Sequence, residues 1–195
     1  MRNAVVFLAA VLCSVPAISQ APAAQSPAAD LGPAIQAEVE HIKGWTQDGT
    51  ILGAVRDKNA LRIPLSRIRS IDISWMTATE PDSRMLELLN NPCAKRLHAF
   101  TDARPGYREA FVMENQGALV CMTRKTSDYW QGDEDKWQKS FAGGRGAVYV
   151  GEPEFDESTG TKLVHVSVPI MDGGKAIGVI TVGIDYEFLR RRAVR

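Results

Sequence analysis

Residues 166–185, with the sequence VSVPIMDGGKAIGVITVGID, decide the fold of this chain. Two apolar runs flank Asp172-Gly173-Gly174, a composition typical of a tight β-hairpin. Alternate positions of the second run place apolar groups on both of its sides, so neither side looks fully solvated. A sheet with both faces covered needs helices on one side and a second covering element on the other.

The sequence before this hairpin predicts further strands. The segment EAFVMENQGALVCMT contains two short apolar runs around a hairpin-like Asn-Gln-Gly turn. The segment AVYVGEPEFDESTGTKLVHVSVPI contains two more around Ser-Thr-Gly. We therefore expect strands at about 110–114, 118–123, 147–151, 162–170 and 176–184.

The first half of the domain is predicted to be helical. From Pro33, which suits a first helical turn, Ile35, Val39 and Ile42 recur at helical spacing. This spacing predicts a long N-terminal helix. Two further helical segments, PLSRIRSIDISWM and DSRMLELLNN, follow, and the second stops before Pro92, where proline discourages continuation.

The beginning of the chain is not expected to join the fold. Residues 1–19 contain Arg2, a short apolar run and then small residues, the order of a secretory signal peptide. A membrane anchor is disfavoured because a spanning helix needs roughly 20 apolar residues. Residues 20–32 are a low-complexity linker. The remaining residues, 33–195, have the length and apolar content of one domain, and export implies a periplasmic location.

Charge and cysteine content limit the function classes. The chain has 23 basic and 23 acidic side chains, so it lacks the basic excess of nucleic-acid-binding proteins. The arginines of the C-terminal LRRRAVR suit the end of a last helix better than a lipid-binding patch. Cys93 and Cys121 lie in a compartment that permits a disulfide, and two buried free thiols are the alternative.

The order of these elements, and the ending VSVPI…GGKAIGVITVGID above all, resembles the extracytoplasmic sensor domains of the Cache type, also called PDC or PAS-like sensors. The resemblance covers roughly residues 31–189. It implies an α+β fold, a five-stranded antiparallel PAS-like sheet with a long N-terminal helix and additional helices on one face. It also implies that a small ligand binds between the sheet and the loop joining strands two and three, and that the protein signals without catalysing a reaction.

Most members of this family lie between two membrane helices and carry an output module, whereas this chain ends at Arg195 soon after its last strand. We therefore expect a solitary sensor module without its own output domain, acting through a membrane-bound signalling partner. The N-terminal helix is the expected surface for a homodimer, and in a ligand-free interaction subunit it would dock the membrane protein. The alternatives are a ligand-free interaction subunit of a membrane complex and a small periplasmic enzyme.

The predicted ligand site lies in SDYWQGDEDKWQ, residues 127–138. Amino-acid-binding family members typically carry an Arg-x-Trp-Tyr clamp here and an aspartate on the last strand. The comparable positions are Asp135, Trp137, Gln138 and Gly183. The clamp for the carboxylate of an α-amino acid and the aspartate for its amino group are therefore both missing. Rings and carboxylates together favour a cationic amine or quaternary ammonium ligand. The candidate ligand-binding residues are Asp128, Tyr129, Trp130, Asp133, Glu134, Trp137 and His165.

A structural role for the same residues stays open. Asp133 suits a helix N-cap, Glu134 and Asp135 suit a first helical turn, and Trp137 can pack on Phe141 at i, i+4. The rings that precede the cap suit either a pocket or a core. A histidine on a sheet face is usually a hydrogen-bonded packing residue, with ligand contact as the alternative.

No cofactor or metal is predicted. Cys93, His98 and Cys121 lack zinc spacing, and residues 128–135 lack the alternating ligands and glycine of a calcium loop. The sequence contains no nucleophile elbow, His-Glu-x-x-His motif or paired-cysteine redox motif, so we assign no catalytic residue and do not expect an enzyme.

Export generates the first testable prediction. If residues 1–19 are a signal peptide, the protein recovered from the periplasm should begin at Gln20, because signal peptidase removes the preceding segment. Intact-mass spectrometry checks this. A protein that keeps Met1 and fractionates with membranes contradicts the prediction.

Overall fold

The computed structural model describes residues 31–157 and 159–194. The predicted signal peptide and residues 20–30 of the predicted linker lie outside the described residues. The last two linker positions belong to the fold instead, because Leu31 is buried and the first helix begins at Gly32. Within the described ranges, no helix has the length and apolar character needed to cross a bilayer.

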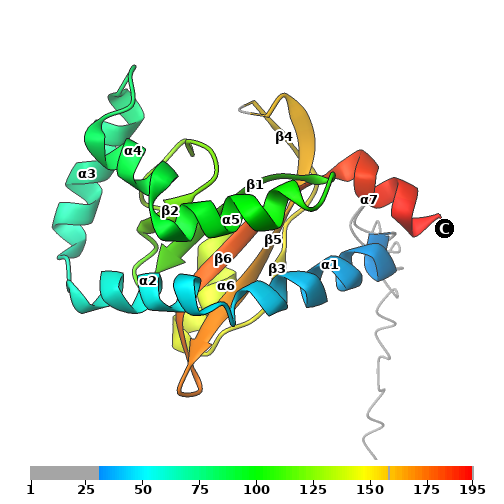
Figure 1. Cartoon of the computed structure of the whole chain (residues 1–195), viewed down its shortest axis with the longest axis horizontal. Helices are drawn as coiled ribbons and strands as arrows, with labels where there is room; N and C mark the ends of the chain where they lie inside the picture. Colours follow the sequence, from blue (N-terminus) through cyan, green and yellow to red (C-terminus); the bar gives the residue numbers. More distant parts are fainter. Residues whose placement is uncertain (1–30, 158, 195) are drawn as a thin grey trace, which may run out of the picture.

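The fold is α+β and is built on one antiparallel sheet, as predicted (Figure 1). The sheet order is β2-β1-β6-β5-β3, and a short strand β4, which the sequence analysis missed, pairs with β5. The expected strands all occur in this sheet. Their bounds are Tyr107–Glu114 for β1, Leu119–Met122 for β2, Tyr149–Val150 for β3, Glu154–Asp156 for β4, Thr161–Asp172 for β5 and Lys175–Asp185 for β6.

The β5–β6 hairpin is the longest pairing in the sheet, extending from Leu163↔Asp185 to Asp172↔Lys175. Its turn depends on Gly173 and Gly174, whose φ angles of 55° and 80° lie in the region that two-residue hairpin turns require. Arg56 donates two hydrogen bonds of 2.8 Å to the carboxylate of Asp172. The turn is thereby tied to the helical layer.

One face of the sheet is covered by helices α1, α2, α5 and α7, which bury a continuous apolar core against the strands. The predicted N-terminal helix is present, with Ile35, Val39 and Ile42 buried. It ends at Trp45, and Asp48 then caps a second helix by accepting the N–H groups of Thr50 and Ile51. The bounds are Gly32–Trp45 for α1, Gly49–Ala60 for α2, Pro92–Asp102 for α5 and Tyr186–Ala193 for α7.

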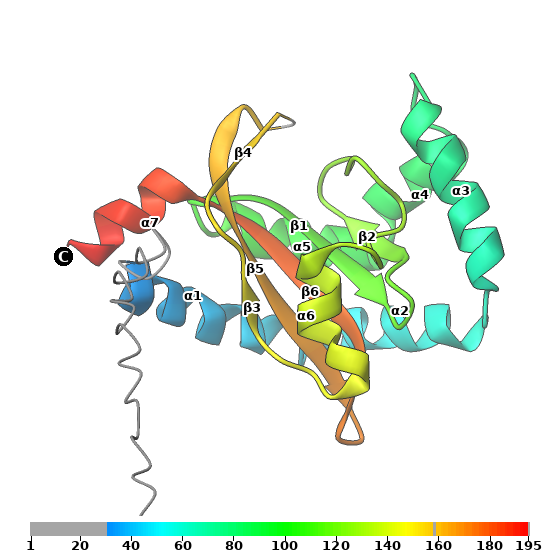
Figure 2. The same cartoon turned by 180° about the vertical axis from the view of Figure 1, so that it is seen from behind.

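The opposite face is covered by the segment between β2 and β3, as Figure 2 shows with α6 crossing the strands. A second apolar cluster forms here, with Trp75, Tyr129 and Phe111 among its largest buried side chains. Part of this face carries no such cover, and the pocket described below occupies that part. The remaining bounds are Leu65–Thr77 for α3, Ser83–Asn90 for α4, Asp135–Phe141 for α6 and Ala142–Gly144 for a 3-10 turn.

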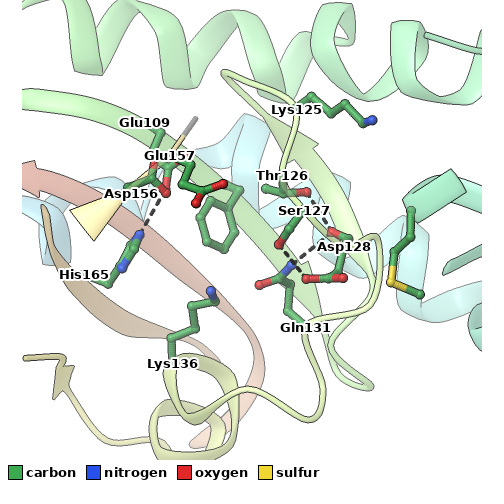
Figure 3. A pocket seen from close by; sticks show the side chains of 12 residues that line it. Glu109, Lys125, Thr126, Ser127, Asp128, Gln131, Lys136, Asp156, Glu157 and His165 are labelled. Carbon is green, nitrogen blue, oxygen red and sulfur yellow. Dashed lines mark hydrogen bonds and ion pairs between the residues drawn. The ribbon is translucent and has the colours of Figure 1, made fainter. Parts of the chain in front are cut away.

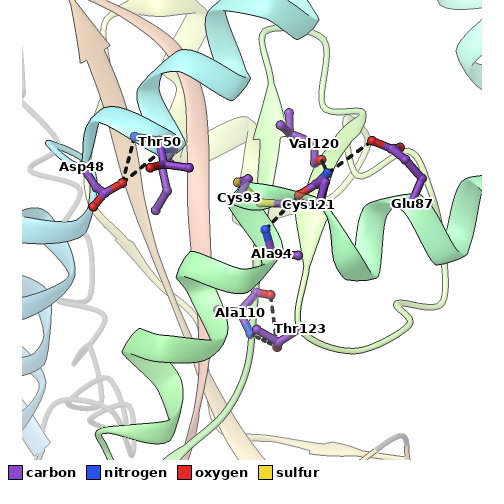
Figure 4. The surroundings of a disulfide bond; sticks show 11 residues. Asp48, Thr50, Glu87, Cys93, Ala94, Ala110, Val120, Cys121 and Thr123 are labelled. Atoms are coloured by element: carbon purple, nitrogen blue, oxygen red, sulfur yellow. Dashed lines mark hydrogen bonds between the residues drawn. A yellow bond between two sulfur atoms is a disulfide. The ribbon is translucent and has the colours of Figure 1, made fainter.

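A disulfide joins Cys93 at the start of α5 to Cys121 in β2 (Figure 4). Both cysteines are buried in the core of the helical face, and the side-chain carbonyl of Asn91, which caps α5, accepts the N–H of Ala94 beside them. The bond closes a sequence separation of 28 residues. It resolves the choice between a disulfide and two free thiols.

Replacing both cysteines with serine should destabilise the fold without changing ligand affinity. Loss of a native disulfide costs about 2–4 kcal/mol, and two hydroxyl groups would occupy an apolar core. Chemical denaturation measures the first quantity and titration calorimetry the second. A double variant that keeps its stability but loses binding would place the cysteines in the site and contradict this assignment.

Candidate functional site

The main pocket on the sheet lies on the face opposite α1, between β1, β5, the loop after β2 and α6 (Figure 3). Its volume is about 640 Å³, within the roughly 300–1,000 Å³ of sites that enclose small molecules. The side chains that line it come from segments far apart in sequence: Met76, Glu109, Phe111, Lys125, Thr126, Ser127, Asp128, Gln131, Lys136, Asp156, Glu157 and His165.

The floor of the pocket is formed by Glu109 and Phe111, which lie two positions apart on the same face of β1, and by His165 of β5. Glu109 is 5% exposed, and Phe111 is 2% exposed. Nε2 of His165 lies 3.0 Å from Oε1 of Glu109. Because an ionised carboxylate only accepts, the imidazole Nε2–H donates this bond. The floor therefore combines a buried acidic group with an aromatic ring.

The loop wall of the pocket is fixed by hydrogen bonds to its backbone. The carbonyl of Asp128 accepts from the Thr126 hydroxyl at 2.7 Å and from the Gln131 amide at 2.9 Å. The carbonyl of Thr126 accepts from the indole N–H of Trp75 at 2.9 Å. These hydrogen bonds to the backbone define the conformation of the wall against the sheet.

Asp72 of α3 anchors the same loop from outside the pocket. Its Oδ1 accepts the backbone N–H groups of Tyr129 and Trp130 at 2.8 Å and 3.0 Å. The carboxylate thus satisfies two donors that the loop conformation leaves without strand partners. Its role is to position the loop wall against the sheet.

The charges around the pocket are predominantly acidic. Four carboxylates line it, against two ammonium groups and one imidazole. Lys136 lies 5.9 Å from the centre of the Phe111 ring, and Lys125 donates to the carbonyl of Ala78 at 3.2 Å. The site can therefore attract a cation while keeping a donor for a polar substituent.

Some residues predicted from the sequence lie in cavities. Asp128 and His165 line the main pocket. Glu134 lines an adjoining cavity of about 380 Å³, which shares Lys136, Asp156 and His165 with it. Asp133 is exposed and lines neither cavity. The predicted cap at Asp133 was wrong by one residue, since α6 begins after Glu134, whose side chain makes no capping hydrogen bond.

The predicted aromatic residues pack in the core under the loop. Tyr129 is fully buried at 5.7 Å from the ring of Trp75, and burial raises the pKa of its phenol to about 12. The indole of Trp130 donates to the carbonyl of Gln116 at 2.7 Å, and its ring faces Arg69 at 4.8 Å.

Trp137 is held in the same way as Trp130. Its indole donates to the carbonyl of Glu114 at 3.2 Å, and its ring stacks on Phe141 at 4.8 Å, the predicted i, i+4 contact. Buried indoles need an acceptor, and both tryptophans find one in the β1–β2 hairpin. Neither tryptophan is among the side chains that line the main pocket.

Most of the pocket lining was not predicted from the sequence, including Glu109, Phe111, Gln131 and Lys136. A signal for two of them was present, because Glu109 and Phe111 alternate along β1 and therefore share a face. An acidic residue directly before the apolar run 110–113 is costly to bury unless it has a partner. No sequence signal linked Glu109 to His165, which is 56 residues away.

Within the described part of the chain, no group of three His, Cys, Asp or Glu side chains is placed to hold a metal ion. Glu109, Asp156 and Glu157 lie together at the His165 end of the pocket, and Asp128 lies on the loop wall on the other side (Figure 3).

Comparison with known proteins gives a family match and similar solved structures. Residues 86–191, more than half of the chain, match the model for the methyl-accepting chemotaxis protein-like, first PDC sensor domain. A search of curated proteins found no match.

Two similar solved structures come from chemoreceptors. The ligand-binding domain of Campylobacter jejuni chemoreceptor Tlp3, in complex with 4-methylisoleucine, is 15% identical with a TM-score of 0.43 and is matched over 83% of this chain and 62% of that one. The ligand-binding domain of the Pseudomonas aeruginosa PAO1 amino acid chemoreceptor PctC, in complex with GABA, is 17% identical with a TM-score of 0.41, over 74% and 63%. The chain thus spans less than two thirds of the length of either structure.

Replacing Trp130 with phenylalanine should lower stability and leave ligand affinity unchanged. The variant keeps a ring but removes the hydrogen bond from the indole N–H to the part-buried carbonyl of Gln116, at a cost of about 0.5–1.5 kcal/mol. Denaturant melts and calorimetric titration measure the two effects. A loss of affinity with unchanged stability would restore the hypothesis of an aromatic cage around the ligand.

Proposed function

Because the chain belongs to the methyl-accepting chemotaxis protein-like PDC sensor family, we propose that it senses a small molecule bound in the pocket between the sheet and the loop after β2. The observation that carries this proposal is the pocket itself. Its volume of about 640 Å³ and its convergent polar groups over a buried floor are the features of a small-molecule site.

The pocket is also suited to report on its contents. One wall is the loop 123–134, the floor is the sheet, and α6 borders it through Lys136. A ligand that contacts all three binds better when they are close together, so its binding free energy favours one arrangement of the loop and α6. This preference for one arrangement of the loop and α6 is the change that we assign to sensing. We expect the ligand to bind without being converted chemically.

The ligand class that we propose is a small organic cation such as an amine. The excess of carboxylates over ammonium groups supports this class, and so does the Phe111 ring on the floor, since ring faces attract ammonium groups. An anionic ligand would have to bind beside four carboxylates and is disfavoured by the same charges.

We further propose that the domain works outside the cytoplasm and passes its signal to a membrane-bound partner. The predicted signal peptide supports export, and the family supports signalling. The solvent-facing side of α1 is the surface that we assign to this partner or to a second copy of the chain. Its exposed polar residues include Gln36, Glu40 and Lys43.

A thermal-shift screen of the purified protein tests the proposal. Amines, quaternary ammonium compounds, amino acids, short carboxylates and purines should be compared under identical conditions. At one hundred times its dissociation constant, a specific ligand stabilises the fold by about 2.7 kcal/mol, or about 5–10 °C for a protein of this size.

A variant that fills the pocket tests whether the ligand that raises the melting temperature binds there. Ser127 lines the pocket and is exposed, so Ser127→Trp should fold and should abolish the ligand-induced shift by occupying the space. Ser66→Trp, at an exposed position of α3 that lies outside the pocket lining, is the matched control and should keep the shift. If no compound stabilises the protein, or if Ser127→Trp responds as the control does, the pocket is not the sensing site.

A further inference from the structure

Glu109, Gly183 and His165 form one row across three strands. Glu109 of β1 is the register partner of Gly183 in β6, and Gly183 is in turn the partner of His165 in β5. The two side chains meet over the middle strand, with Nε2 and Oε1 separated by 3.0 Å. A side chain on the middle strand would stand directly between them.

The space over Gly183 is already filled by its neighbours. A Cβ atom at this position would lie 2.8 Å from Cγ of Glu109, 2.9 Å from Cδ1 of Leu163 and 3.2 Å from Oε1 of Glu109. Such distances are too short for carbon contacts, so any larger residue would displace the Glu109 side chain. Glycine in a strand interior often marks a close approach of this kind.

The Glu109 carboxylate has a second oxygen, Oε2, on a side chain that lines the pocket. Among the side-chain contacts of the described residues, the Glu109 carboxylate contacts another side chain only through Oε1, which lies against His165. Both residues line the pocket. The side chain of Glu109 is 7% exposed, so its charge is poorly solvated and acts on a ligand at a low local dielectric. A cationic group at Oε2 would supply the counter-charge.

We propose that the Glu109–Gly183–His165 row sets the charge specificity of the pocket for an ammonium ligand. Glu109 binds the cationic group through Oε2. His165 is a positioning residue that holds Oε1, and Gly183 is the position whose lack of a side chain makes the pair possible. This inference rests on the proposed function and adds the group that selects the ligand.

The other charges of the pocket are less suited to this role. Asp128 accepts a hydrogen bond from the neighbouring Ser127 hydroxyl, and Oδ1 of Asp156 already accepts the backbone N–H and the hydroxyl of Thr159. Glu157 is exposed. Lys136 faces the Phe111 ring and opposes cations near the centre of the pocket, which confines an ammonium group to the Glu109 end. Selectivity should therefore depend on Glu109 more than on the rim carboxylates.

The first experiment compares three probes of equal chain length at pH 7: n-butylammonium, n-butanol and butyrate. Calorimetry on the full chain should give the highest affinity for the cation. Glu109→Gln keeps the size of the side chain and an acceptor for His165 but removes the charge, so it should weaken n-butylammonium binding at least tenfold and leave n-butanol binding unchanged. Asp133→Asn, an exposed acid outside the pocket, is the matched control and should bind as the unaltered chain does.

The second experiment tests whether the missing side chain at Gly183 is required for the Glu109–His165 pair. Gly183→Ala should reduce the ratio of cation to alcohol affinity, because the methyl group displaces the Glu109 carboxylate. Gly178→Ala, in the same strand, crowds the carbonyl of Met113 and the Val55 side chain away from the pocket lining, so it controls for strain. It should lower the melting temperature while keeping that ratio. A loss of stability alone does not change the ratio of cation to alcohol affinity. This ratio therefore separates an effect on the position of the Glu109 carboxylate from an effect on folding.

The outcomes separate this inference from the function it rests on. If probes bind and Ser127→Trp blocks them, but Glu109→Gln keeps full preference for n-butylammonium, the specificity row is wrong and the sensing pocket stands. If butyrate binds most tightly, the row is also wrong. If Ser127→Trp does not block binding, the sensing pocket itself fails.

Discussion

The antiparallel pairing of β5 and β6 is the constraint on which the rest of the structure depends. It places an 11-residue strand, β6, between β1 and β5, where both of its faces are covered. Such a strand can be apolar throughout, and eight of its residues in succession, 178–185, are buried. The Gly173-Gly174 turn fixes the register, and a shift by one residue would exchange the two faces of the strand.

The two faces of this sheet serve different purposes. The helical face is sealed by α1, α2 and α5 and contains the disulfide, so it supplies most of the apolar burial. The apolar cluster on the other face includes residues of α3, α4 and the loop after β2, and the pocket lies beside it over β1 and β5. A polar floor at Glu109 is tolerated there because His165 gives the carboxylate a partner.

A bulge in β1 connects the two faces. The register shifts between Tyr107 and Glu109, so Glu109 points to the pocket while Tyr107 points to the helical core. There the Tyr107 hydroxyl donates to the fully buried carboxylate of Glu38 in α1 at 2.6 Å, and burial raises the pKa of this phenol. Arg104 and Arg192 complete the ion pairs of Glu38 at 2.9 Å and 3.4 Å. The strand that carries the pocket acid thus also holds α1 and α7 together.

The sequence was sufficient to predict the sheet but not the site. Period-two apolar runs and glycine turns are local signals, and they predicted every strand except β4, whose sequence Glu-Phe-Asp contains a single apolar residue and therefore no apolar run. The rings of Tyr129, Trp130 and Trp137 suggested a ligand cage, yet their direction depends on acceptors in another hairpin, which composition does not encode. Glu109 and His165 meet only because β6 lies between their strands and has glycine at the crossing.

The crystal structure of the protein with the strongest amine from the screen tests the central claim most directly. We predict the ligand in the pocket over β1 and β5, with its ammonium group within hydrogen-bonding distance of Oε2 of Glu109 and its apolar part over the Phe111 ring. A ligand found between Trp130 and Trp137 would contradict this prediction. So would a ligand in the separate cavity of about 630 Å³ that Gly53 and Lys58 of α2 and Leu88 of α4 help to line.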